Sequence, residues 1–216
     1  MLGPSPEGRP RHAAALLEEV ERAATAAGGW DEVDLIATGL GPGSFTGVRI
    51  AIATARGLAA STGLPLAGIC TLDAIARGLP ASVVTLPREA RRGNGGSLAV
   101  LDARRGEVFA ALYGEGGERL WEPFVDSPEE LVARIAELPE PPRAAGSGAL
   151  RFRQELARIG VEVPGDADPV HRVAARHVCA LAATGKARDA GPLAPIYLRP
   201  PDAVRWRERD TVKTAE

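Results

Sequence analysis

Cysteine, histidine and aromatic residues are scarce in this sequence of 216 residues, which holds two cysteines, three histidines and 4% aromatic residues. Cys70 and Cys179 lie far apart and outside any C-x-x-C pair, which excludes a zinc ribbon, a redox motif and a disulfide scaffold. The histidines form no H-x-x-x-H pair, which excludes the helical metal site of a metalloprotease. We therefore expect two reduced thiols and no bound metal.

Long apolar runs and a large excess of one charge are also absent. The longest uncharged run, 57–72, is interrupted by glycine and proline and is shorter than the roughly 18 apolar residues that cross a bilayer. The first twelve residues lack the apolar core of a signal peptide. The net charge of -2 argues against RNA binding by the whole surface. We expect a cytoplasmic protein without membrane contact, which reaches any RNA through a partner.

The first part of the chain has the pattern of a parallel β-α-β unit. Helical periodicity over 11–27 is followed by an apolar run at 33–38 that predicts a buried strand. A second helix is predicted over 48–61, a second strand over 66–69 and a short helix over 71–76. Two strands joined in this way pair in parallel, with a right-handed crossover.

A change of composition separates this unit from the rest of the chain. Residues 87–96 combine a basic cluster with three glycines and predict a linker. After the linker the apolar period becomes two, so three strands over 97–101, 107–113 and 118–124 are predicted to form an antiparallel meander.

The remaining elements follow the meander. A capping box at 127–130, with proline at the first helical position, opens a helix to about Leu138. A strand and two more helices are predicted over 143–146, 149–159 and 169–184. The chain is thus divided into an N-terminal half, a linker, a C-terminal half and a tail, at residues 1–86, 87–96, 97–191 and 192–216.

A glycine-rich loop, GLGPGSFTGVRI at 39–50, joins the first strand to the second helix. Such a turn exposes backbone N–H groups at the positive end of a helix dipole and suits an anion. The P-loop lysine is missing, however, and the Rossmann pattern G-x-G-x-x-G fails by one residue. The loop by itself is therefore weak evidence for a nucleotide site, whose candidate residues are Gly41, Gly43, Ser44, Thr46 and Gly47.

Ser44 is not expected to be a nucleophile. A nucleophile elbow needs glycine where Pro42 stands, and the two later histidines fall on opposite faces of one predicted helix. Ser44 and Thr46 are interpreted as capping residues of the following helix. We therefore expect no catalytic residue.

Small residues form rows along the helix at 48–61, including one with Ala51, Ala55 and Ala59. Such rows let another helix approach closely. The pattern leaves two alternatives open: packing inside the chain, or pairing with a similar surface of another chain.

Several motifs together resemble the TsaB (YeaZ) family, bacterial proteins of threonylcarbamoyladenosine tRNA modification. They are GPGSFTGVRI, ATARGLA, TLDAIA, LDARRGEVFAALY and PIYLR, and the resemblance extends from about residue 11 to residue 199. It implies an α/β, actin-like ATPase (ASKHA) fold with two related mixed-sheet halves. It also implies that the chain binds no cofactor of its own, since ATP is used by partner subunits.

The resemblance further implies a non-catalytic subunit that pairs with TsaD and activates it. TsaD transfers the threonylcarbamoyl group to the adenosine beside the tRNA anticodon, so tRNA is contacted through TsaD, while TsaE joins the complex. A homodimer is the second pairing considered for the chain when it is alone, and the sequence leaves it open. Pairing is implied for the first two helices, with the contact residues Leu16, Leu17, Val20, Arg49, Ile52, Ala55, Arg56 and Ala59. The alternative function is a nucleotide-dependent kinase or ATPase of the same fold.

One departure from the family concerns the start of the chain. Family members begin with a β-meander whose first strand reads like ILALDT, whereas LGPSPEGRPRH follows Met1 here. We therefore expect an N-terminally truncated first half that lacks two strands and most of a third. The strand at 33–38 would then present an exposed apolar edge that is prone to aggregation.

Overall fold

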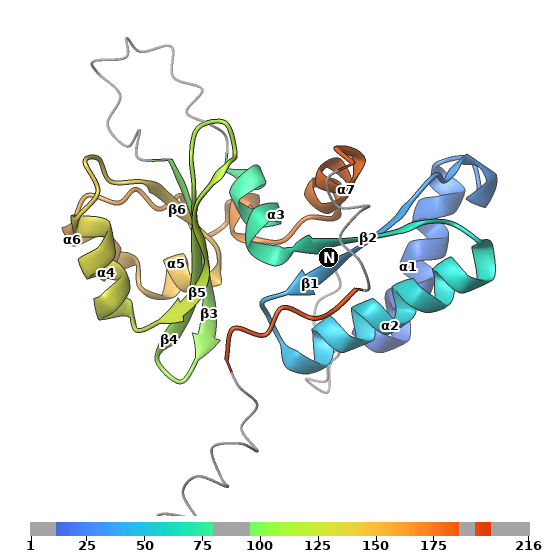
Figure 1. Cartoon of the computed structure of the whole chain (residues 1–216), viewed down its shortest axis with the longest axis horizontal. Helices are drawn as coiled ribbons and strands as arrows, with labels where there is room; N and C mark the ends of the chain where they lie inside the picture. Colours follow the sequence, from blue (N-terminus) through green and yellow to red (C-terminus); the bar gives the residue numbers. More distant parts are fainter. Residues whose placement is uncertain (1–11, 80–95, 186–192, 200–216) are drawn as a thin grey trace, which may run out of the picture.

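The computed structural model describes residues 12–79, 96–185 and 193–199. They form two lobes that lie side by side, each built around a β-sheet (Figure 1). Helix α3 (Thr71–Gly78) lies between the sheets and contacts both. The predicted linker, except for Gly96, and most of the predicted tail lie outside the described residues. Among the helices that the structure describes, none combines the length and apolarity that a bilayer crossing requires.

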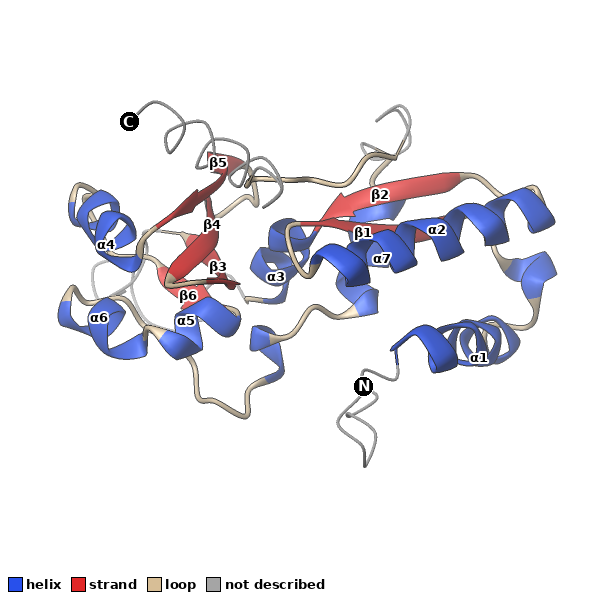
Figure 2. Cartoon of the chain, turned by 90° about the horizontal axis from the view of Figure 1, so that it is seen from below, coloured by secondary structure: helices blue, strands red, loops and turns tan. Residues whose placement is uncertain are grey.

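The first lobe is a parallel β-α-β unit, as predicted. Strands β1 (Ile36–Gly41) and β2 (Leu66–Cys70) pair in parallel, and α2 (Phe45–Thr62) connects them. Helix α1 (His12–Ala26) and the 3-10 turn η1 (Trp30–Glu32) precede β1. Helix α1 packs mainly against α2 and η1 (Figure 2).

Two boundaries in this lobe differ from the prediction. The strand predicted over 33–38 lies at Ile36–Gly41, because Gly39 and Gly41 pair with Ile69 and Cys70 in the ladder. Sheet pairing overrides the turn preference of these glycines. The helix predicted from Val48 begins three residues earlier, directly after its N-cap.

The second lobe contains a mixed sheet with the strand order β5-β4-β3-β6. Strands β3 (Ser97–Arg104), β4 (Glu107–Tyr113) and β5 (Arg119–Asp126) form the predicted antiparallel meander. The short β6 (Arg143–Ala145) pairs in parallel with β3. The predicted meander and the predicted strand near 143 are confirmed.

Both faces of the central strands β3 and β4 are largely buried, and the period of two assigns their side chains to the two faces. Leu98 and Val100 face the core that is covered by the helices α4 (Pro128–Ala136), α5 (Ser147–Arg151) and α6 (Arg153–Arg158). Ala99 faces the opposite side and packs with α3. Neighbouring residues of β3 therefore belong to two different hydrophobic cores, one on each face of the sheet.

Two predicted helices are divided in the structure. The helix predicted over 149–159 is interrupted at Phe152, which separates α5 from α6. The helix predicted over 169–184 consists of the 3-10 turn η3 (Pro169–His171) and α7 (Ala175–Ala183). His171 anchors this turn because its Nδ1 accepts a hydrogen bond from the backbone N–H of Gly146 and its Nε2 lies 3.1 Å from the carbonyl oxygen of Pro164.

Helix α7 follows the second lobe in sequence but packs on the first lobe. Val178 and Ala182 are buried against Ala67, Ile69 and Ala74. Figure 1 shows α7 on the side of β1 and β2 that lies opposite α2. The predicted C-terminal half, 97–191, therefore includes a helix that covers the first sheet. Local sequence periodicity gives no information about which sheet a helix covers.

Candidate functional site

Helix α2 presents one face to the protein's own sheet. A methyl carbon of Val48 lies beside Gly41, and Ile52 and Ala55 follow on the same face at helical spacing. Ile52 is 5% exposed and Ala55 is 6% exposed. The prediction that these two residues contact a partner is wrong, because they are buried in the chain's own core. Ala59 is half-buried.

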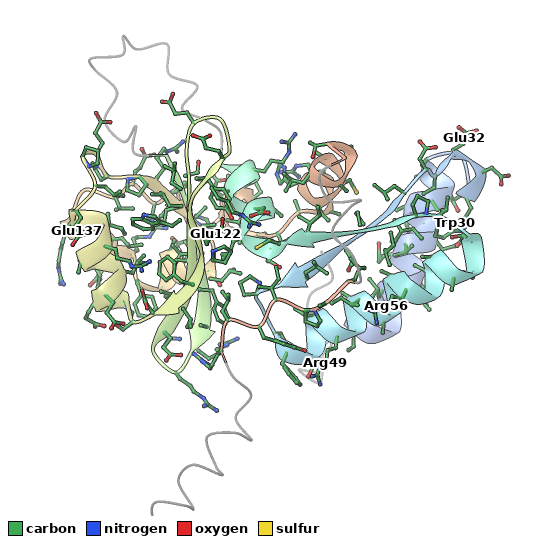
Figure 3. All side chains as sticks on the ribbon, viewed as in Figure 1. Trp30, Glu32, Arg49, Arg56, Glu122 and Glu137 are labelled. Atoms are coloured by element: carbon green, nitrogen blue, oxygen red, sulfur yellow. The ribbon has the colours of Figure 1, made fainter. Side chains whose placement is uncertain are left out.

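The other predicted contact residues lie at or near the surface. Leu17 of α1 is 57% exposed, and Leu16 and Val20 are half-buried. Arg49 and Arg56 are exposed on α2, two turns apart (Figure 3). The structure thus separates the predicted set into a buried pair on α2 and six residues that solvent reaches.

An exposed cluster of two aromatic rings and one arginine lies at the start of α2. The guanidinium carbon of Arg49 is 3.7 Å from the ring centroid of Phe45 and 5.7 Å from that of Tyr197. Nε of Arg49 donates a 2.8 Å hydrogen bond to the Tyr197 hydroxyl oxygen, and the two ring centroids are 5.6 Å apart. Phe45 and Tyr197 are nevertheless 48% and 45% exposed.

Neither aromatic residue was predicted to belong to the site. Phe45 lies within the glycine-rich motif and Tyr197 lies within PIYLR. The motifs therefore marked both positions but did not indicate what the two side chains contact. Arg49 and Tyr197 are separated by 148 positions in the sequence, so no local pattern indicates that they are in contact.

The glycine-rich loop leads directly into this cluster. Ser44 caps α2, because its hydroxyl oxygen accepts a 3.4 Å hydrogen bond from the backbone N–H of Gly47. This confirms the predicted cap at Ser44, whereas Thr46 lies inside the first helical turn and is not the N-cap. Gly41 has a φ of +96°, and a Cβ there would lie 3.2 Å from the carbonyl oxygen of Ile196. The loop thus packs against the chain's own residues 193–199, and Gly43 is exposed. Nucleotide binding by this loop stays a prediction.

A second polar cluster joins α3 to the second sheet. The Asp73 carboxylate accepts hydrogen bonds from the Tyr113 hydroxyl at 2.6 Å and from Nε and Nη2 of Arg119 at 3.0 and 2.7 Å. The hydrogen bond to Asp73 raises the pKa of Arg119 above its ordinary value. Burial, and then the charge of Asp73, raises the pKa of Tyr113. Tyr113 is therefore neutral and Arg119 is charged at neutral pH.

The thiol of Cys70 adjoins this cluster. Burial, assisted by the charge of Asp73, raises the pKa of Cys70 to about 11. A thiol that stays protonated at neutral pH is a poor nucleophile. We find a cluster that holds two layers together and that supplies no activated nucleophile or base.

The hairpin between β3 and β4 carries a third charged cluster. Asp102 accepts a 2.9 Å hydrogen bond from Nη1 of Arg151 and a 2.8 Å bond from the backbone N–H of Arg104. Burial acts to raise the pKa of Asp102, but these donors outweigh it and the pKa falls below its ordinary value. Within the part of the chain that the structure describes, no group of three or more potential metal ligands gathers.

Comparison with known proteins places the chain among tRNA-modification proteins. The family model described as "TsaD: tRNA N6-adenosine threonylcarbamoyltransferase" matches residues 5–182. The tRNA threonylcarbamoyladenosine biosynthesis protein TsaB of Escherichia coli is 32% identical over 186 residues, which cover 82% of this chain and 74% of that protein. An uncharacterized protein of Mycobacterium leprae is 33% identical over 172 residues. This match covers 80% of the chain but only 40% of the mycobacterial protein.

Solved structures agree with these matches. YeaZ from Pseudomonas aeruginosa superposes with a TM-score of 0.67 at 28% identity, covering 88% of this chain and 87% of that one. A second Pseudomonas aeruginosa structure, described as similar to peptidase YEAZ, has a TM-score of 0.66 at 29% identity and covers 87% and 84%. The α/β, actin-like ATPase (ASKHA) fold expected from the motifs is confirmed. The chain belongs to the TsaB (YeaZ) family, among the sequences that the TsaD family model describes.

Proposed function

We propose that this chain is a non-catalytic subunit that pairs with TsaD and activates it. TsaD then transfers the threonylcarbamoyl group to the adenosine adjacent to the tRNA anticodon. The family membership supports the pathway, because the Escherichia coli relative is named as a threonylcarbamoyladenosine biosynthesis protein. The match to the TsaD family model supports pairing, because related subunits of one fold present related surfaces.

The main support for pairing with TsaD is a group of exposed hydrophobic side chains on the first lobe. Among the described residues, five large hydrophobic side chains are exposed, and Leu17, Phe45 and Tyr197 lie on α1, on α2 or beside α2. Phe45 and Tyr197 pack around Arg49, and these three residues together with Leu17 of the adjoining helix α1 are what we call the α1–α2 surface. Exposed apolar patches mark interaction sites, and aromatic residues and arginine dominate the energetics of protein interfaces.

The polar clusters support a non-catalytic role. The carboxylates of Asp73 and Asp102 are each held by an arginine, and the hydroxyl of Ser44 caps α2. Each of these groups already makes a hydrogen bond or ion pair that joins elements of the fold, which supports a structural role. ATP is used by the partner subunits in this proposal, TsaE joins the complex, and tRNA is reached through TsaD. Without TsaD, the α1–α2 surface pairs two copies of the chain.

Pairing is tested by co-elution of the purified chain with TsaD of the same organism in size-exclusion chromatography. The Leu17→Glu variant places a charge on the α1–α2 surface and should abolish co-elution. Leu120→Glu is the matched control, because Leu120 is 55% exposed on β5 of the other lobe. Leu120→Glu should therefore co-elute like the wild type. Equal co-elution of the two variants would contradict the proposed surface.

Activation is tested by measuring threonylcarbamoyladenosine formation by TsaD with and without the chain. We expect formation to depend on the wild-type chain and to be lost with Leu17→Glu. Calorimetric titration of the isolated chain with ATP and magnesium addresses the alternative function. Tight binding with measurable turnover would favour a kinase or ATPase and would refute the non-catalytic assignment.

A further inference from the structure

Residues 193–199 cross from one lobe to the other. In Figure 1 this segment, coloured red, passes along α2 and ends near the β3–β4 hairpin of the second lobe. It contacts α2, β1, α3 and the hairpin, all of them far away in the sequence. A segment of seven residues thus contacts elements of both lobes.

The segment is anchored to the first lobe at two points. Nη2 of Arg56 donates a 2.7 Å hydrogen bond to the carbonyl oxygen of Leu193, and the backbone N–H of Ile196 donates a 2.8 Å bond to the carbonyl of Leu40. Leu193 itself is buried above Gly68, where a Cβ would lie 2.6 Å from its methyl carbon. A Cβ at position 68 would also meet the Leu40 side chain, so the glycine leaves room for both leucines on the sheet.

The segment is anchored to the second lobe by Arg199. Its guanidinium forms an ion pair with Glu107, and Nη1 donates a 3.2 Å hydrogen bond to the carbonyl oxygen of Ala103. Both acceptors belong to the β3–β4 hairpin, and the Arg199 side chain is mostly buried. Between the two anchors, Ile196 packs against the core that α3 shares with the second sheet.

We propose that residues 193–199 form an interlobe clasp. The clasp fixes the angle between the lobes, and Tyr197 completes the α1–α2 surface by packing on Phe45 and Arg49. A charge-assisted hydrogen bond and a buried leucine hold opposite ends of this short segment. Release of either end removes one link between the lobes and loosens the angle that α3 and its Asp73 cluster leave between them. The role of Tyr197 in pairing rests on the proposed function, whereas the control of the lobe angle does not.

The lobe angle is measured by the distance between two spin labels on the full chain. One label is attached to the native Cys179, exposed on α7, and the other to Ala133→Cys, exposed on α4. Double electron–electron resonance of the otherwise wild-type chain should give one narrow distance distribution. Arg199→Glu and Glu107→Arg should each broaden it, because each places two like charges together.

A double variant and a control variant make this test specific to the clasp, and a third variant covers a failure to fold. The double variant Arg199→Glu/Glu107→Arg restores opposite charges and should return the narrow distribution. Glu162→Arg reverses the 2.9 Å ion pair with Arg143 inside the second lobe and should leave the distribution unchanged. Arg199→Gln replaces Arg199→Glu if circular dichroism shows that the charge reversal prevents folding. An unchanged distribution in the single variants, or no narrowing in the double variant, overturns the clasp.

Pairing with TsaD is then measured for the same variants. Arg199→Glu and Tyr197→Ala should weaken pairing by about 5-fold or more, the lower end of typical coupling between two sites. Either variant could still pair with TsaD at wild-type strength, in Arg199→Glu although its distance distribution is broadened. That result would refute the link between the clasp and pairing, but it would not refute the clasp itself. If the wild-type chain does not pair with TsaD, the proposed function and the link between clasp and pairing are both refuted. The distance measurement still tests whether residues 193–199 fix the lobe angle.

Discussion

Replacement of Asp73 by alanine should destabilise the chain strongly, although Asp73 lies outside the α1–α2 surface. Its carboxylate is the common acceptor for Tyr113 of β4 and Arg119 of β5, which attach α3 to the second sheet. Asp73→Ala removes all three hydrogen bonds at once. It also leaves the buried Tyr113 hydroxyl without this partner.

The magnitude follows from the number and type of these bonds. A hydrogen bond to a charged group contributes about 1.5–3 kcal/mol, and the contributions of bonds that share one acceptor do not add fully. Both charged side chains are partly exposed, which weakens the ion pair further. We therefore expect Asp73→Ala to lower the free energy of unfolding by about 3 kcal/mol, and Tyr113→Phe by about 1 kcal/mol.

Urea unfolding followed by far-UV circular dichroism measures these free energies. The double variant Asp73→Ala/Tyr113→Phe should lose less than the sum of the single variants, by about 1 kcal/mol, because one bond is shared. Glu19→Ala is the matched control, since it breaks an exposed ion pair with Arg22 and should cost less than about 0.5 kcal/mol. A loss for Asp73→Ala as small as that of Glu19→Ala would refute the reasoning.

Three further predictions concern single groups. Ser127→Ala should lower stability by about 1 kcal/mol in thermal unfolding, because the capping box between Ser127 and Glu130 is complete; wild-type stability would contradict this. Ellman's reagent should modify Cys179 rapidly and Cys70 only after unfolding, because Cys70 is buried and its pKa is about 11; two fast thiols would be contrary evidence. The lowered pKa of Asp102 implies a stability contribution that is complete above its ordinary pKa of 3.8 and lost as the pH falls through the folded value. Asp102→Asn should flatten the fall in urea midpoint between about pH 5 and pH 3, and an unchanged fall would argue against this assignment.

The sequence was sufficient for features whose causes are local. Apolar periodicity predicted the β-α-β unit and the meander, because a strand or helix must bury one face whatever its partner is. Hydroxyl chemistry predicted the caps at Ser44 and Ser127, since each satisfies N–H groups within three residues. These predictions needed no information about the tertiary fold.

Features that depend on contacts between residues far apart in the sequence could not be predicted from local patterns. The row containing Ala55 correctly indicated close approach to another element, but the element is the chain's own sheet and not a partner. The helix predicted over 169–184 is divided because the buried His171 bonds to Gly146, 25 positions earlier. The contact between Arg49 and Tyr197 likewise depends on residues 193–199 returning to lie along α2.

The glycine-rich loop shows how a local pattern and a distant contact are connected. Glycine at position 41 suggested a phosphate site, but its φ of +96° and the Ile196 carbonyl, 3.2 Å from where a Cβ would lie, require glycine without any ligand. The same close approach brings the following Tyr197 onto Phe45 and Arg49 at the start of α2. The glycine therefore serves the docking of residues 193–199. It follows that the glycine content of this loop is not by itself an argument for nucleotide binding.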